Sequence, residues 1–89
     1  MVKVVFTPNL ARHVDNPVCD VKGATVREAL DRVFADNPRL RGYVLDDQAG
    51  LRRHMSVFVD GQQVKDRAGL SDPIGANSTI FVAQALSGG

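Results

Sequence analysis

The chain has 89 residues, a length that fits one domain with one modest hydrophobic core. Its 44 % hydrophobic and 24 % charged residues exclude disordered and collagen-like compositions. Eleven basic and ten acidic residues give a net charge of +1, which offers no electrostatic case for a nucleic-acid partner. No apolar run approaches the roughly 18 residues of a membrane span, and the first residues lack a signal-peptide pattern. We therefore expect no membrane partner and a cytoplasmic location.

Two short strands are expected near the start. Residues 2–7 are rich in β-branched and aromatic side chains and are followed by Pro8, which predicts a strand that ends there. Residues 18–21 alternate apolar and polar side chains and fit the second arm of a hairpin.

One amphipathic helix is the clearest element of the sequence. Its apolar stripe recurs at helical spacing and comprises Val26, Ala29, Leu30, Val33 and Phe34. Thr25 and Glu28 form a capping box at its start, and Asn37-Pro38 ends it. We expect its charged side chains to face water, namely Arg27, Asp31, Arg32 and Asp36.

The second half of the chain predicts short elements separated by turns. We expect a short helical turn over residues 39–45, a polar loop over 46–50 and a strand over 54–59. A very short strand over 63–64, an inward-facing turn over 70–74 and a final strand over 78–86 follow. Asp60-Gly61 is a strong signal for a tight hairpin turn after the third strand.

This order of elements predicts an α+β fold in which one main helix covers one face of a mixed sheet. The β-grasp topology fits it, with the first and last strands adjacent and parallel in the middle of the sheet. We expect a β-grasp domain over residues 1–86 and a flexible tail over residues 87–89, because no apolar side chain follows Leu86.

The second half also resembles a known family. The matching stretches are residues 55–64, 70–72, 78–82 and the terminal Gly88-Gly89. They resemble ubiquitin and, more closely, the bacterial sulfur carriers of molybdopterin, thiamin and cysteine biosynthesis. The long segment between Pro38 and His54 and the ending over residues 85–89 look most like the cysteine and molybdopterin types. Each position is a weak signal, but their order together with a diglycine ending is specific.

The resemblance implies a function for the last residue. In such carriers an activating enzyme uses ATP to adenylate the terminal carboxylate, here that of Gly89, and a sulfur donor converts it to a thiocarboxylate. This group then delivers sulfide to an acceptor enzyme or synthase subunit. Gly88 and Gly89 lack Cβ atoms, so the tail can thread a narrow channel. The carrier itself would be no enzyme and would bind no cofactor.

Two other functions stay open. A ubiquitin-like modifier would form isopeptide bonds with lysines through the same activated Gly89. A β-grasp binding module would have incidental glycines and would keep its function without Gly89.

Side-chain alternation predicts the two faces of the sheet. Against the helix we place Val2, Val4, Phe6, Val57, Val59, Ile80 and Val82. On the opposite, exposed face we place a partner-binding surface of Val5, Phe58, Phe81 and Ala83, with Leu86 as an anchor beside the tail. Phe58 matches the position of the exposed isoleucine that ubiquitin's partners bind. The alternative is that residues 39–53 cover Phe58 or Phe81.

Other reactive residues are given no catalytic role. The single Cys19 excludes internal disulfides and the four-thiolate clusters of β-grasp ferredoxins, and a strand thiol is usually inert. His13 and His54 lack metal-ligand spacing. Asp46-Asp47 fits a solvated turn. The arginines of residues 39–53 either dock an acidic partner or are simply solvated, and they are Arg39, Arg41, Arg52 and Arg53.

Overall fold

The structure is a computed structural model that describes residues 1–7 and 18–84. Five strands and two helices lie in this part of the chain. They are β1 (Val2–Phe6), β2 (Val18–Val21), α2 (Val26–Asp36), α3 (Pro38–Val44), β3 (Met55–Val59), β4 (Gln62–Gln63) and β5 (Thr79–Gln84). Each predicted element is present, with ends shifted by one or two residues. The last two residues of the predicted final strand lie outside the described range.

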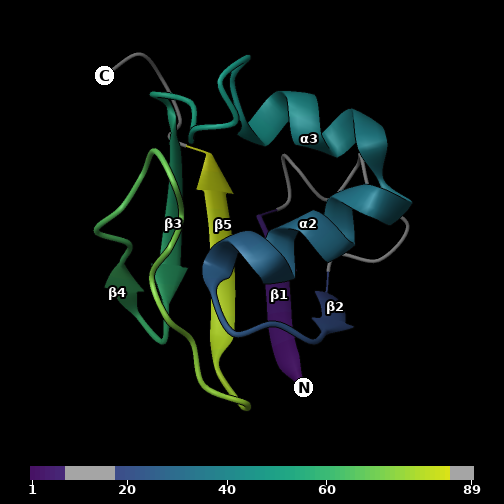
Figure 1. The fold of residues 1–89 in the computed structure, drawn as a ribbon, viewed down its shortest axis with the longest axis vertical. Coiled ribbons are helices and arrows are strands. Elements are labelled where there is room, and N and C mark those ends of the chain that lie inside the picture. Colours follow the sequence, from purple (N-terminus) through teal and green to yellow (C-terminus); the bar gives the residue numbers. More distant parts are fainter. Residues whose placement is uncertain (8–17, 85–89) are drawn as a thin grey trace.

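The strands form one mixed sheet in the order β2-β1-β5-β3-β4. The parallel pair β1 and β5 occupies its centre, as the β-grasp topology predicts. Figure 1 shows α2 lying across one face of the sheet and α3 beyond it, near the end at which β5 finishes. The α+β class and the single covered face are therefore confirmed.

The hairpin between β3 and β4 has the turn that its residues predict. Val59 pairs with Gln62, so Asp60 and Gly61 alone make the loop. Both have positive φ, 50° and 88°, which is the requirement of a type I′ turn. The Asp60 carboxylate also accepts a hydrogen bond from the Thr79 backbone N–H at 2.9 Å, which fixes the hairpin to the start of β5.

Helix α2 starts and ends at the predicted residues. Thr25 Oγ1 accepts from the Glu28 N–H at 3.2 Å, and Glu28 Oε1 accepts from the Ala24 N–H at 3.2 Å. The glutamate thus reaches one residue further back than in a standard capping box. At the other end, Asn37 Nδ2 donates to the Val33 carbonyl, which satisfies one of the last helical acceptors.

The core lies between this helix and the sheet. All five residues of the apolar stripe of α2 are buried, and so are the helix-facing residues of β1, β3 and β5 except Val59, which is partly buried against them. Leu40 and Val44 of α3 close the core at one end, together with Leu45 and Leu51. The predicted helix-facing set is confirmed.

Arg27 faces water only in part, because it is partly buried against two loops, and the prediction missed this contact. Its guanidinium donates to the carbonyls of Ala49, Ala68 and Gly69, at 2.7, 3.2 and 3.1 Å. Two loops far away in sequence fold against the start of α2 and bring these acceptors to it. Helical periodicity reports where the apolar stripe points and cannot reveal such a contact. The other three residues of that prediction, Asp31, Arg32 and Asp36, are exposed, as predicted.

Leu70 combines full burial with a left-handed backbone, at φ 53°. For a non-glycine residue this conformation costs about 1–2 kcal/mol. Burying a leucine side chain gains roughly 1.5–3 kcal/mol, so the inward position predicted for Leu70 offsets the strain.

Among the described residues, none of the helices has the length and apolar character that crossing a membrane requires.

Candidate functional site

The open face of the sheet carries an apolar row that runs across four strands. Phe81 on β5 is directly opposite Phe58 on β3 and Val5 on β1. Val5 in turn is opposite Val18 on β2. Residues paired in register point to the same face of a sheet, so these four side chains stand side by side. We call this set the apolar row.

The apolar row is accessible. Phe81 is 39 % exposed and Val18 is 44 % exposed, whereas Val5 and Phe58 are partly buried. The prediction that Val5, Phe58 and Phe81 lie on the face opposite the helix is therefore correct, although only Phe81 among them is exposed, and the prediction did not include Val18. A signal for it was present, since Val18 begins the strand that alternation pairs with residues 2–7.

Residues 39–53 do not cover this face. Four of their apolar side chains, Leu40, Val44, Leu45 and Leu51, are buried in the core that lies on the helix side of the sheet, and Phe81 itself is exposed. Figure 1 shows α3 on that same side. The alternative in which this segment covers Phe81 is thereby excluded.

Beyond the apolar row, the open face continues toward the end of β5. Ala83 lies two residues after Phe81, is partly buried, and pairs with Ser56. The next pair, Gln84 with Met55, is the last of the sheet. The last described residue, Gln84, therefore lies on a central strand, just beyond the apolar row. Leu86, Gly88 and Gly89 lie outside the described residues, so their predicted roles stay predictions.

The start of β3, which pairs with the end of β5, is held by two arginines. Arg67 Nη2 donates to the carbonyls of Arg52 and Met55, at 2.9 and 2.8 Å. Arg52 Nε donates to the Gly42 carbonyl at the end of α3, at 2.8 Å. These bonds fix the backbone of residues 52–55 from both sides. Sequence reasoning did not single out Arg67, because its acceptors are 12 to 15 residues away.

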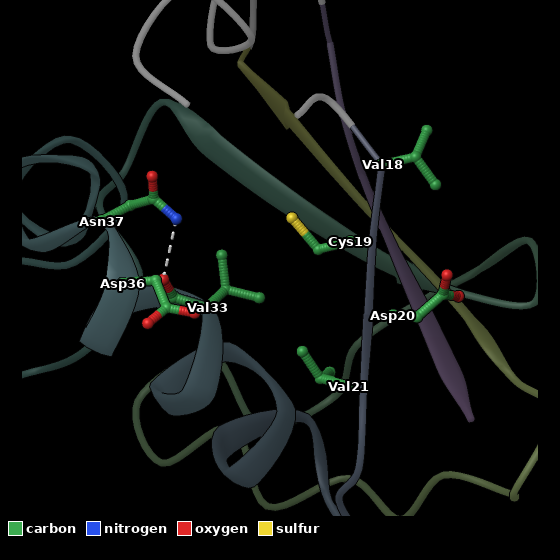
Figure 2. Close-up of a pocket in the computed structure, with 7 residues that line it drawn as sticks. All are labelled: Val18, Cys19, Asp20, Val21, Val33, Asp36 and Asn37. Atoms are coloured by element: carbon green, nitrogen blue, oxygen red, sulfur yellow. Dashed lines mark hydrogen bonds between the residues drawn. The ribbon is translucent and has the colours of Figure 1, made fainter. Parts of the chain in front are cut away.

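Cys19 lies in a groove of about 470 Å³ between β2 and the end of α2. In Figure 2, Cys19 and Val21 point toward Val33 of the helix, whereas Val18 and Asp20 point the opposite way. Burial raises the pKa of the Cys19 thiol, and the nearby carboxylates of Asp20 and Asp36 raise it further. Because the thiolate is the reactive form, this environment supports the prediction that Cys19 is inert.

The remaining candidates are structural or solvated. Asp46 Oδ1 accepts from the N–H groups of Gln48 and Gly50, at 2.9 and 3.0 Å, so the Asp46-Asp47 pair forms the predicted turn. In residues 1–7 and 18–84, no group of three or more His, Cys, Asp or Glu side chains has an arrangement that could hold a metal. His13 lies outside that part of the chain.

The strand order, the helix across one face and the open opposite face together define the fold class: this chain has the ubiquitin-like β-grasp fold. Among solved structures, the CysO chain of the Amycolatopsis orientalis BexX/CysO complex is 26 % identical, with a TM-score of 0.87 over 100 % of both chains. SAMP1 from Haloferax volcanii is also 26 % identical, with a TM-score of 0.81 over 99 % of this chain and 98 % of its own. CysO from Mycobacterium tuberculosis is 18 % identical and shares the fold at a TM-score of 0.83 over 97 % of this chain and 100 % of its own.

These neighbours confirm the resemblance to the ubiquitin-like β-grasp sulfur carriers. They are small carrier or modifier proteins rather than enzymes, and one was crystallised in complex with a partner protein. A sulfur-carrier or ubiquitin-like role is thus supported for this chain. No protein-family model and no curated protein sequence matches it.

Proposed function

We propose that this protein is a sulfur carrier that acts through the carboxylate of Gly89. The full-length similarity to CysO is the observation that carries the proposal. The exit of the chain from the central strand β5, beside an accessible apolar row, adds support. A partner that docks on this row lies close to Gln84, the last described residue before the tail.

The chemistry needs only the acyl end of the carrier. An oxygen of the Gly89 carboxylate attacks the α-phosphorus of ATP, and pyrophosphate leaves. A hydrosulfide-level donor then attacks the acyl carbon, and AMP leaves as the carbon–sulfur bond forms. The product is a thiocarboxylate, a soft nucleophile that transfers its sulfur to an acceptor. ATP and the catalytic groups belong to the activating enzyme, so the carrier requires no bound cofactor.

The cysteine and molybdopterin types of carrier are the favoured pathways. The support is the sequence itself, in which the long segment between Pro38 and His54 and the ending over residues 85–89 fit those two types. In the structure this segment supplies α3 and one end of the core, so it is an integral part of the domain.

Intact-mass spectrometry of the protein isolated from its own host tests the proposal. A carrier shows a fraction of molecules in which one oxygen is replaced by sulfur, and fragmentation places the change on Gly89. This mass change disappears when Gly89 is deleted. A host sample with the unmodified mass alone, under conditions of sulfur demand, would contradict the proposal.

A protein modifier is the second candidate, and the similarity to SAMP1 favours it. Here a lysine amine attacks the activated Gly89 carbonyl and forms an isopeptide bond. The same mass measurement separates the two functions, because conjugation yields larger adducts in which a lysine of another protein carries a Gly-Gly remnant.

A further inference from the structure

Strand β2 forms one edge of the sheet, and within residues 1–7 and 18–84 no strand lies on its outer side. Two hydrogen bonds fix which of its backbone groups point outward. The Lys3 N–H donates to the Ser78 carbonyl at 3.0 Å. The Thr7 N–H donates to the Val82 carbonyl of β5 at 3.1 Å. The odd-numbered residues of β1 therefore direct their backbone groups toward β5, and the even-numbered residues direct theirs toward β2.

The outward-pointing groups of β2 belong to Val18 and Asp20. Residues opposite each other in an antiparallel pair exchange either both backbone hydrogen bonds or neither. Val4, an even-numbered residue of β1, is opposite Cys19, so these two residues exchange both bonds. The neighbours of Cys19 along β2 therefore direct their N–H and C=O groups away from the sheet. A strand that lies alongside β2 meets two donors and two acceptors, two residues apart, as a sheet requires.

The groove of about 470 Å³ that contains Cys19 runs beside this edge, on the helix side of the sheet. Figure 2 shows Cys19 and Val21 on one side of it and Val33 of α2 on the other. A strand added to β2 alternates its side chains between the two faces of the sheet, so every second side chain enters this groove. The groove thus fits an extended segment with apolar side chains at those positions.

The groove and the edge carry negative charge. Asp20 of β2 and Asp36 of α2 are both exposed and both line the groove, and no basic side chain is among its seven described lining residues. Both carboxylates raise the pKa of the Cys19 thiol, so the charge of each reaches the groove. The last turn of α2 contains no basic residue, and the carbonyls at a helix C-terminus add partial negative charge. Lys3 is opposite Asp20 in the register but does not line the groove.

We propose that the outer edge of β2 binds an extended segment of a partner protein as an additional strand, with apolar side chains in the groove and lysine or arginine side chains beside Asp20 and Asp36. The backbone groups of β2 supply affinity, and the groove and the two carboxylates select the side chains. A second copy of this chain fits less well, because its own β2 brings the same negative charges. The inference is independent of the proposed function, since it uses the edge of the sheet and neither Gly89 nor the aromatic side chains of the open face.

A synthetic peptide tests the inference on the full chain. The probe is acetylated and amidated Lys-Arg-Val-Lys-Val-Arg-Lys, which places both valines and both terminal lysines on one face of a strand. Its sequence is the same in both directions, so it suits parallel and antiparallel addition. In NMR titrations, the amides of Val18 and Asp20 should shift and become protected from hydrogen exchange. The same peptide with every backbone nitrogen methylated has no donors, and it should bind on the order of tenfold more weakly.

Variants of the chain test the two carboxylates. Asp20→Asn and Asp36→Asn should each weaken binding of the peptide roughly two- to fivefold, the usual range for an exposed ion pair. Asp31→Asn is the matched control, because Asp31 is exposed on the same helix and does not line the groove. Asp20→Pro also removes the outward N–H, which an edge strand tolerates, and should weaken binding on the order of tenfold. Thermal melts of the three asparagine variants should match the wild type.

Four outcomes would overturn the inference. Strong protection of the Asp20 amide in the free protein would show that the edge is already paired. Shifts confined to the amides of Phe58 and Phe81 would place the peptide on the open face. Equal binding of the methylated peptide would reduce the contact to unspecific charge attraction. A dimer that dissociates in Asp20→Pro, measured by sedimentation velocity, would assign the edge to a second copy of the chain.

Discussion

Phe58 and Phe81 stand directly opposite each other on β3 and β5, on the face of the sheet that the helices leave uncovered. Phe58 is partly buried and Phe81 is exposed. An aromatic pair in the middle of an accessible face is typical of the centre of a protein interface. The predictions below begin from this pair.

Phe81→Asp is expected to weaken binding to the activating enzyme about 30-fold, and Phe58→Asp at least as much. Each change places a charge in an apolar contact that must lose its water on association, at a cost of roughly 2 kcal/mol. Binding calorimetry measures the loss. Thr79→Asp is the control, because Thr79 is exposed on the same face of β5 at its far end and should bind normally. Both phenylalanine variants should still unfold cooperatively near the wild-type melting temperature. Loss of the cooperative transition in Phe58→Asp would instead show that Phe58 is a core residue.

Deletion of Gly89 is expected to abolish adenylation without changing stability. The shortened chain still ends in a carboxylate, that of Gly88, so intrinsic reactivity is preserved. Reach is lost, since one extended residue spans about 3.3–3.6 Å and a misplacement of about 1 Å can cost on the order of a hundredfold in rate. Pyrophosphate exchange measures the step directly. Near-normal exchange by the truncated chain would remove Gly89 as the activated residue.

Arg27→Met is expected to lower the free energy of unfolding by about 2 kcal/mol and the melting temperature by about 10 °C. The variant keeps the methylene stem but loses the hydrogen bonds to the carbonyls of Ala49, Ala68 and Gly69. Arg32→Met is the matched control, because Arg32 is an exposed residue of the same helix. Equal melting temperatures for the two variants would show that these bonds contribute nothing net.

Arg27 and Arg67 show what can and what cannot be predicted from the sequence. Residues 26–36 predict a helix because capping and apolar spacing are local properties, and the alternation of β1, β3 and β5 predicts both faces of the sheet. The roles of Arg27 and Arg67 are not predictable in this way. Their acceptors are backbone carbonyls, which every residue has, and the pairing depends on how loops 12 to 42 residues away return to the helix or the turn. The periodicity of apolar residues gives no information on where these loops fold.

Asp72→Asn is expected to lower stability at neutral pH, and the difference from the wild type should shrink in acid. Hydrogen bonds from the backbone N–H groups of Lys65 and Asp66 lower the pKa of the Asp72 carboxyl in the folded protein. As the pH falls, the unfolded chain therefore protonates this carboxyl before the folded protein does, near the ordinary aspartate pKa of about 3.9. The stabilisation is complete above that pH and is lost as the pH falls through the lower, folded pKa.

Urea unfolding between pH 7 and about pH 2 measures this dependence. Asp31→Asn removes the same charge from an exposed position of α2 and controls for net charge. Asp66 should behave like Asp72, because the Ser71 hydroxyl donates to its carboxylate at 2.6 Å and lowers its pKa together with the Gly69 and Ser71 N–H groups. A gap between wild type and Asp72→Asn that stays constant down to about pH 2 would contradict the assignment.

Cys19 is expected to react slowly with iodoacetamide at pH 7. Burial, followed by the charges of Asp20 and Asp36, raises its pKa above the ordinary value of 9.0, so little thiolate is present. The rate should climb as the pH passes that value. Glutathione is the reference thiol, and alkylation of Cys19 at an equal rate at pH 7 would indicate an activated cysteine.

The central position of β5 bears on the order in which the molecule is made. β5 is synthesised after every other described strand, yet it lies between β1 and β3 and is the only strand that joins them. In the native sheet β1 and β3 can therefore be joined only after β5 has been synthesised, up to residue 84. A prematurely terminated product has two unjoined half-sheets, an open core and no Gly88-Gly89. The open face formed by β1, β3 and β5 is therefore completed only when residue 84 has been added, so a partner that requires the apolar row cannot bind a chain that ends before β5.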